Sequence, residues 1–357
     1  IQARCKQESG ALTRRDFIRL VSGGLAGTLL LSDMIMGSNT LWATNLSPEN
    51  KDEYLKRLIK NAPRARYWIS SKNKKNCQTC HTPEVFAGNT SYKHHSKPVK
   101  CLLCAQECEI EAGERGKCRA RININGELRS LVYGYPVTTH IDPIEKKPFY
   151  HFLPGRESFS LATAGCPLSC KFCQNWNISQ ARPENYQGEY IKPSRIPASA
   201  YHRKVPIIAY TYNEPTVFTE YFLDIAEKSQ RYKMKNVLIS CGFMKEQPLA
   251  DMCSVLDAIK IDLKGFSEKF YQNICNAELK PVLRSIKQVA KSGVHLEIVN
   301  LVVPTLNDSE KMLHELCNWV AAEIGPDIPI HFTRFHPAYQ MQNLPPTPVA
   351  TLQLARN

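Results

Sequence analysis

The sequence predicts an α/β fold, namely an incomplete (βα)6 barrel preceded by a small N-terminal cysteine-rich, metal-binding module. Short apolar strand patterns alternate with amphipathic helical patterns from residue 158 onward. Fourteen cysteines fall in clusters with short spacings, which favours metal ligation over a disulfide framework. We expect four segments: a signal segment at 1–43, a linker at 44–99, the module at 100–150 and the barrel at 151–357, with a truncated C-terminus.

The composition is that of a globular protein with a substantial core, since 43% of the residues are hydrophobic and 22% are charged. A net charge of +13 would suit an acidic partner or an anionic surface. The lysines and arginines are spread along the chain, however, and we find no nucleic-acid-binding motif. We therefore expect no nucleic-acid partner.

The N-terminal segment is similar to an export signal. The stretch Thr13–Arg19 contains a twin arginine, and the apolar run Leu20–Leu31 that follows is too short to span a bilayer. A small-residue cleavage site lies near Ala43. This pattern predicts export to the periplasm or cell envelope, with a membrane contact only through the signal. The alternative is an ordinary amphipathic helix in a cytoplasmic protein.

A C-x-x-C-H motif lies in the linker, at Cys77, Cys80 and His81. This pattern is the attachment signature of a c-type haem, which is bound through two thioethers and an axial histidine. The rival interpretation is that the two cysteines belong to a second iron–sulfur or zinc site. Before the motif, the sparse apolar spacing of 47–67 predicts one surface helix that ends at Pro63.

The second cysteine cluster has four potential ligands in eighteen residues, at Cys101, Cys104, Cys108 and Cys118. Four thiolates close a coordination sphere, so this site should be structural or electron-relaying, with zinc or an iron–sulfur cluster as its metal. Gly113 and Gly116 let the chain fold back toward the last ligand. Beyond it, Asn125-Gly126 predicts a hairpin turn, and we expect a connector at 141–151.

The barrel is predicted from six apolar strand patterns with helices between them. Strands are expected at 159–163, 207–212, 237–240, 258–263, 295–303 and 330–335, and helices include 280–292 and 309–324. Parallel strand–helix units place their chemistry at the carboxyl ends of the strands. A triplet of cysteines, Cys166, Cys170 and Cys173, follows the first strand.

The odd number of cysteines in this triplet is informative. Three thiolates on one loop can hold three irons of a [4Fe–4S] cluster and leave the fourth iron open. The alternative is a zinc loop that takes a fourth ligand from elsewhere in the chain.

The stretch 165–177, G-C-P-L-S-C-K-F-C-Q-N-W-N, resembles the cluster loop of radical SAM enzymes. It is most similar to pyruvate formate-lyase activating enzymes and to the radical SAM enzymes of the AmmeMemoRadiSam system. The resemblance runs from about Lys100 to the end of the chain. The Cys101–Cys118 segment resembles the N-terminal module of the latter group, with Ala105 where proline is usual. The resemblance implies a radical SAM barrel, a [4Fe–4S] cluster and S-adenosylmethionine (SAM).

The resemblance also implies cofactor-binding residues. Asn213 and Glu214 stand where the family has its Gly-Gly-Glu motif, which binds the methionyl amino group, although a helix N-cap is the alternative for Glu214. Asp262 and Lys264 match an Asp-x-Lys signature, for which a structural ion pair is the alternative. The remaining expected SAM contacts are Ser240, Val303 and His336.

Other histidines and cysteines receive no such role. His331 would point elsewhere, into the core. Cys253, Cys275 and Cys317 have no partners at metal spacing, so we expect them to be packing residues.

The function that the resemblance implies is reductive cleavage of SAM to a 5'-deoxyadenosyl radical, which abstracts hydrogen. A protein substrate is expected, as in the activation of glycyl radical enzymes, together with a low-potential electron donor. A second hypothesis is an iron–sulfur and haem electron-transfer protein that does not cleave SAM. A third is a zinc-stabilised binding protein.

Overall fold

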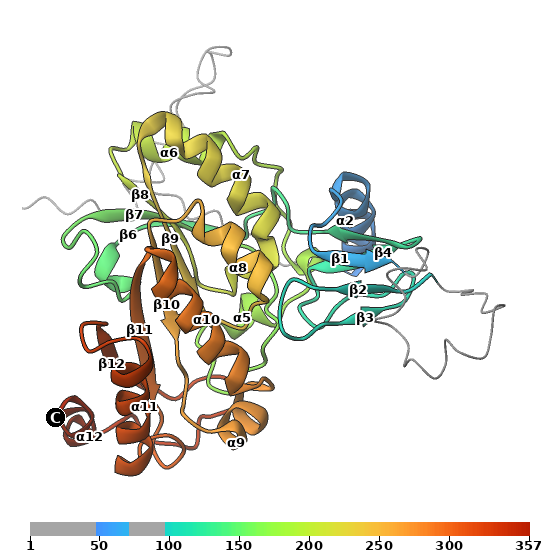
Figure 1. Cartoon of the computed structure of the whole chain (residues 1–357). Helices are drawn as coiled ribbons and strands as arrows, with labels where there is room; N and C mark the ends of the chain where they lie inside the picture. The colour runs from blue at the N-terminus through green and yellow to red at the C-terminus, as the bar shows by residue number, and fades with distance from the viewer. Residues whose placement is uncertain (1–47, 71–96) are drawn as a thin grey trace, which may run out of the picture. The chain divides into compact units, whose positions relative to one another are not determined.

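The fold is built on a seven-stranded sheet, seen in a computed structural model that describes residues 48–70 and 97–357 (Figure 1). The sheet has the order β12-β11-β10-β9-β8-β7-β6. Six strands are parallel to one another: β7 (Glu157–Ala162), β8 (Ile207–Tyr210), β9 (Lys235–Ser240), β10 (Ala258–Asp262), β11 (His295–Val302) and β12 (Ile330–Arg334). The predicted α/β fold with its six parallel strands is therefore confirmed.

The seventh strand, β6 (Thr138–Pro143), corrects an expectation. It pairs antiparallel with β7, from Thr138 opposite Ala162 to Pro143 opposite Glu157. The sequence analysis took residues 141–151 for a connector because of their proline and charge content. β6 lies at the edge of the sheet, where a terminal proline removes no ladder hydrogen bond that the sheet needs.

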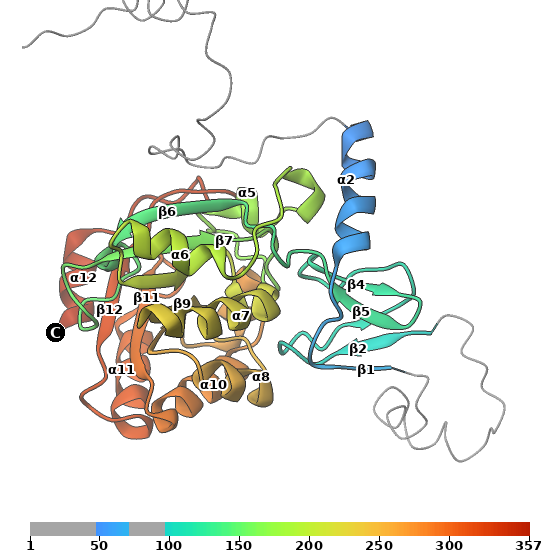
Figure 2. The ribbon, with the colours of Figure 1, turned by 90° about the horizontal axis from the view of Figure 1, so that it is seen from above.

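Helices α7, α8, α10 and α11 cover one side of this sheet (Figures 1 and 2). The helices are α6 (Arg195–His202), α7 (Thr219–Ser229), α8 (Glu246–Cys253), α10 (Leu279–Ser292), α11 (Glu310–Glu323) and α12 (Val349–Arg356). α10 buries Val282, Ile286 and Val289 on one face, at the spacing expected of an amphipathic helix. It ends at Gly293, whose positive φ of 81° suits a helix C-cap.

The cysteine-rich module consists of two small antiparallel sheets. β1 (Trp68–Ser70), β2 (Val99–Cys101) and β3 (Glu109–Ile110) form one sheet, while β4 (Arg121–Ile124) and β5 (Glu127–Ser130) form a hairpin. Asn125 and Gly126 have φ values of 52° and 89°, as the predicted Asn-Gly turn requires. Helix α2 (Pro48–Asn61) packs Tyr54 and Leu58 against a cluster that includes Ile122 of the hairpin.

Module and barrel are joined by a buried ion pair. Arg121 Nη2 of β4 donates to both carboxylate oxygens of Glu220 on α7, at 2.9 and 2.6 Å, and both side chains are buried. Burial alone would lower the pKa of the Arg121 guanidinium, but the Glu220 carboxylate raises it above its ordinary value. Backbone hydrogen bonds add to the junction, with Ala105 N donating to Phe243 O and Lys245 N to Leu103 O.

Two predicted features lie outside the described residues. These are the signal segment at 1–43 and the C-x-x-C-H motif at Cys77, Cys80 and His81. Among the residues that the structure does describe, no helix combines the length and apolar character needed to cross a membrane.

We predict that Arg121→Met lowers the free energy of unfolding by about 3–5 kcal/mol, because it leaves the Glu220 carboxylate buried without its partner. Urea denaturation at fixed metal content measures this change. The control is Lys228→Met, which removes the cation of an ion pair on the surface of α7 and should leave stability close to wild type. Equal effects of the two substitutions would contradict a dominant role for the buried pair.

Candidate functional site

The cysteine triplet lies on the loop that follows β7, at the carboxyl end of that strand. Two backbone hydrogen bonds hold this loop against a short π-helix, Tyr271–Cys275. Ser169 N donates to Cys275 O at 3.1 Å, and Lys171 N donates to Ile274 O at 3.0 Å. π-helical turns occur often at functional sites. The loop is therefore fixed by main-chain contacts to a segment about one hundred residues further along the chain.

The loop opens onto a cavity of about 490 Å³. Most of the residues that the sequence assigned to the [4Fe–4S] cluster and to SAM line this cavity. They are Cys166, Cys170, Cys173, Asn213, Glu214, Asp262 and Lys264. Apolar side chains of Ile239, Val299 and Leu301 form other parts of the wall. The structure thus places the three cysteine thiols in one cavity with the side-chain acceptors of Asn213 and Glu214 and with the ion pair of Asp262 and Lys264.

Asn213 offers an unused acceptor to this cavity. Its Nδ2 donates to Gly165 O at 2.8 Å, whereas its buried Oδ1 has no hydrogen-bond partner. A buried polar atom without a partner is costly, so a ligand that donates a hydrogen bond here would relieve the cost. An ammonium group of an amino-acid ligand is such a donor, which fits the expected role of Asn213 toward SAM.

Glu214 combines the two roles that the sequence left open. It caps the 3-10 helix Pro215–Phe218 by accepting from Thr216 N, and it also lines the cavity. Its Oε1 further accepts from Thr216 Oγ1 at 2.5 Å and from Ser240 Oγ at 2.8 Å. Its Oε2 accepts from Cys241 N at 2.7 Å. Ser240 therefore acts through Glu214 without lining the cavity.

Asp262 and Lys264 form an ion pair on the cavity wall, with Lys264 Nζ 3.2 Å from Asp262 Oδ2. Lys260 pairs with the other oxygen of Asp262. Burial alone would raise the pKa of Asp262, but the two ammonium groups lower it to about 2. Lys264 lies beside the Cys170 sulfur, and the Asp262 and Cys170 charges raise the pKa of its ammonium against the effect of burial. A fixed cation thus adjoins the cysteine loop.

Cys275 is fully buried in the hydrophobic core, as expected of a packing residue. The interaction of its thiol with that of Cys170 lowers the pKa of Cys170 and raises that of Cys275. Cys241 is also buried close to Glu214 and Cys166. Neither cysteine lies at metal-ligand spacing from the triplet in sequence, so spacing alone gave no signal for them.

Besides Ser240, two further expected SAM contacts do not line the cavity. Val303 is fully buried after β11, and its backbone N–H donates to Asn307 Oδ1 at 2.5 Å. His336 is exposed after β12. Lys147, which was not singled out from the sequence, does line the cavity. Burial lowers the pKa of Lys147 to about 8, against the opposing effect of the Asp142 carboxylate.

The four cysteines of the module also converge, around a small apolar cavity that Arg121 and Pro167 help to line. The Nε and Nη1 atoms of Arg121 are buried and have no hydrogen-bond partner. Thiolates of a metal site would supply both the acceptors and the negative charge that these donors need. The residues present therefore fit a four-thiolate metal site, as the sequence predicts.

Gly165 is a point of close approach between the two cysteine loops. Its φ is 100°, and a Cβ atom built there would lie 2.3 Å from the carbonyl oxygen of Cys118. A side chain at this position would meet rigid backbone. Gln106 of the module adds a further contact, because its Nε2 donates to Pro167 O at 3.0 Å.

Comparison with known proteins finds one matching family model and several similar proteins. The model of the Radical SAM superfamily matches residues 160–317. Uncharacterized protein MJ0808 of Methanocaldococcus jannaschii is 42% identical over 259 residues, which are 72% of this chain and 77% of the relative. Pyruvate formate-lyase-activating enzyme of Clostridium pasteurianum is 22% identical over 157 residues, 43% of this chain and 65% of the relative. A radical SAM methyltransferase from Sphaerobacter thermophilus aligns at a TM-score of 0.44 and 13% identity, over 57% of this chain and 64% of its own.

We predict that Gly165→Ala destabilises the protein more than Gly113→Ala does. Both glycines have positive φ, 100° and 87°, so each alanine incurs about 1–2 kcal/mol of left-handed strain. Only at position 165 does the new Cβ also meet a backbone oxygen, because nothing lies within 4 Å at position 113. Thermal unfolding of the two variants measures the difference, and similar melting temperatures would count against the close contact of the two loops.

Proposed function

Because the chain belongs to the radical SAM superfamily, we propose that it holds a [4Fe–4S] cluster on Cys166, Cys170 and Cys173 and binds SAM in the adjoining cavity. The observation that supports this proposal is that three cysteines of one loop and Asn213 line the same cavity of about 490 Å³. The Oδ1 atom of this Asn213 has no hydrogen-bond partner. When bound, the reduced cluster supplies the electron that cleaves SAM to a 5'-deoxyadenosyl radical for hydrogen abstraction.

In this proposal, one set of residues binds SAM and another shields the reacting atoms from water. Asn213 Oδ1 and the Glu214 carboxylate accept hydrogen bonds from the amino group of the methionyl moiety. Lys264 offsets the negative charge of the thiolates and of a ligand carboxylate. The apolar wall around Val299 and Leu301 keeps water and other hydrogen donors away from the reacting atoms.

We further propose that the hydrogen donor is a residue of a partner protein. The similarity to the pyruvate formate-lyase-activating enzyme of Clostridium pasteurianum supports this class of substrate. A partly exposed aromatic pair next to the cysteine loop supports it as well. Trp176 is 47% exposed and stacks on Tyr339 with ring centroids 5.3 Å apart, while Gln340 N donates to Lys171 O of the loop. Tryptophan and tyrosine are enriched where proteins bind other proteins.

We predict that the anaerobically reconstituted protein forms 5'-deoxyadenosine from SAM when a low-potential reductant such as dithionite is added. Cys170→Ala should abolish the product because it removes one thiolate of the loop. Cys317→Ala, which alters a cysteine on α11, should keep full activity. Chromatography of the products measures the reaction. A protein with a verified cluster that forms no product would support the electron-transfer hypothesis in place of the radical one.

We also predict that Asn213→Ala weakens SAM binding roughly 10- to 100-fold, because it removes an acceptor for a charged donor. Asn300→Ala is a matched control. Asn300 is also buried, its Nδ2 donates to Leu263 O at 2.7 Å, and its Oδ1 has no partner, but it does not line the cavity. Equilibrium dialysis of cluster-loaded variants against SAM measures both affinities. A similar loss in the two variants would refute a direct role for Asn213.

A further inference from the structure

A second group of metal-ligating side chains lies near the N-terminal ends of the strands. Glu297 is the third residue of β11 and His331 is the second residue of β12. His151 joins them from the segment that follows the 3-10 helix Ile144–Lys146. The cysteine loop follows the carboxyl end of β7, so this group occupies the other end of the parallel sheet. His331, which was expected to point into the core, points to the fully buried Glu297.

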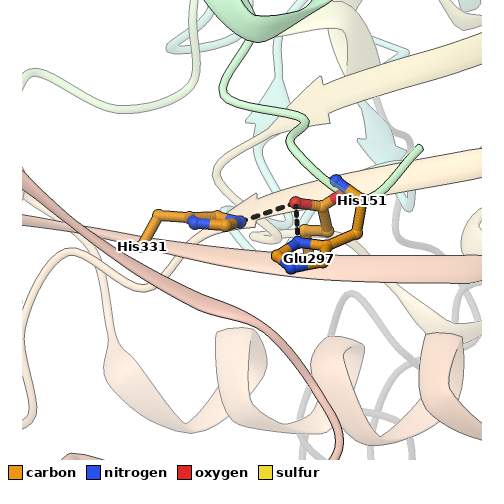
Figure 3. A group of neighbouring side chains, drawn as sticks. All are labelled: His151, Glu297 and His331. Atoms are coloured by element: carbon orange, nitrogen blue, oxygen red, sulfur yellow. Dashed lines mark hydrogen bonds and ion pairs between the residues drawn. The ribbon is translucent and has the colours of Figure 1, made fainter. Parts of the chain in front are cut away.

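One carboxylate oxygen of Glu297 is a hydrogen-bond partner of the imidazoles of both His151 and His331 (Figure 3). His331 Nε2 lies 2.6 Å from Glu297 Oε2, and His151 Nδ1 lies 3.4 Å from the same atom. The three ligand atoms all fall within 4.8 Å of one another. Bonds of about 2.0–2.2 Å to a tetrahedral ion place its ligand atoms roughly 3.3–3.5 Å apart, so small side-chain shifts would complete such a site.

Hydrogen bonds from neighbouring residues keep the Glu297 carboxylate ionised. Tyr150 N donates to Oε2, and both His151 N and His295 Nε2 donate to Oε1, each at 3.0 Å. Burial alone would raise the pKa of Glu297, but these donors and His331 hold it well below its ordinary value. A metal ligand must be deprotonated, and its orientation is commonly fixed by such hydrogen bonds.

The carboxylate has more donors than it needs. Two backbone N–H groups and three imidazoles converge on about four lone-pair positions. The backbone groups and His295 already satisfy most of these positions. Exchanging the His331 proton for a cation, with His151 as a further ligand, would therefore leave no buried acceptor without a partner.

Solvent can reach the group from one side. The side chain of His151 is 57% exposed, whereas that of His331 is 14% exposed and that of Glu297 is fully buried. The rings of His151 and His331 stack with centroids 5.6 Å apart. An ion could enter past His151 and keep a coordination position open to water.

We propose that His151, Glu297 and His331 bind one divalent transition-metal ion of the Zn²⁺ or Fe²⁺ class. Two imidazoles and one carboxylate with an open position are the ligand set that these ions favour. The ion ties the segment that carries His151 to strands β11 and β12. The same segment contributes Lys147 and Pro148 to the wall of the large cavity, so the ion fixes part of that wall. The site does not depend on the proposed radical reaction.

The test is equilibrium dialysis of the protein, with its cysteine sites already loaded, against buffered Zn²⁺, followed by metal analysis. The wild type should bind one more Zn²⁺ per chain than the double variant His151→Ala/His331→Ala. His151→Ala alone should weaken that binding at least tenfold, and it decides the question if the double variant misfolds, because His151 is largely exposed. X-ray absorption should show only nitrogen and oxygen neighbours around the additional ion, at about 2.0–2.2 Å.

His314→Ala is the matched control. His314 is an exposed histidine on α11 that lies 3.7 Å from a carboxylate oxygen of Glu310. This variant should retain the additional ion in full. Equal zinc content in all variants, or sulfur neighbours around the ion that the double variant loses, would overturn the proposal.

Discussion

The junction between the module and the barrel depends on the buried ion pair of Arg121 and Glu220. A guanidinium in a dry interior is tolerated only with a compensating anion, and Glu220 supplies that anion from α7. Its carboxylate also accepts from Arg66 N at 2.7 Å, which brings the chain before β1 to the same point. Arg121 also lines the small cavity between the four cysteines, so one side chain links the fold of the module to its candidate metal site.

The junction between module and barrel also helps to fix the position of the cysteine triplet. Its loop contacts the module through Gly165 and Pro167, and the π-helix through Ser169 and Lys171. These contacts come from parts of the chain that lie far apart in the sequence and pack into one hydrophobic core. The loop is thus held on two sides before any cofactor binds, which is the kind of preorganisation that a reactive site requires. The two cysteine sites are neighbours that share one wall of protein.

The sequence predicted the strands of the barrel and the cysteines well, because periodicity and short-range spacing are local signals. Asn213, Glu214, Asp262 and Lys264 followed from motifs at strand ends, and they do meet on one cavity. Local signals could not find β6, whose proline-containing sequence is permitted only by its edge position. They also could not pair Cys275 with Cys170, or His151 with Glu297 and His331, because these partners meet only when distant strands and loops are packed together.

The docking of the module has a consequence for how this protein can diverge. Much of the contact between module and barrel is made by peptide groups, such as Ala105 N with Phe243 O and Lys245 N with Leu103 O. Every residue type except proline carries both of these groups, so the neighbouring side chains can drift without loss of the contact. Gly165 has no such freedom. In a set of homologues, this junction should therefore appear as variable sequence on both surfaces, interrupted by the buried pair of Arg121 and Glu220 and by one invariant glycine beside the first cysteine of the triplet.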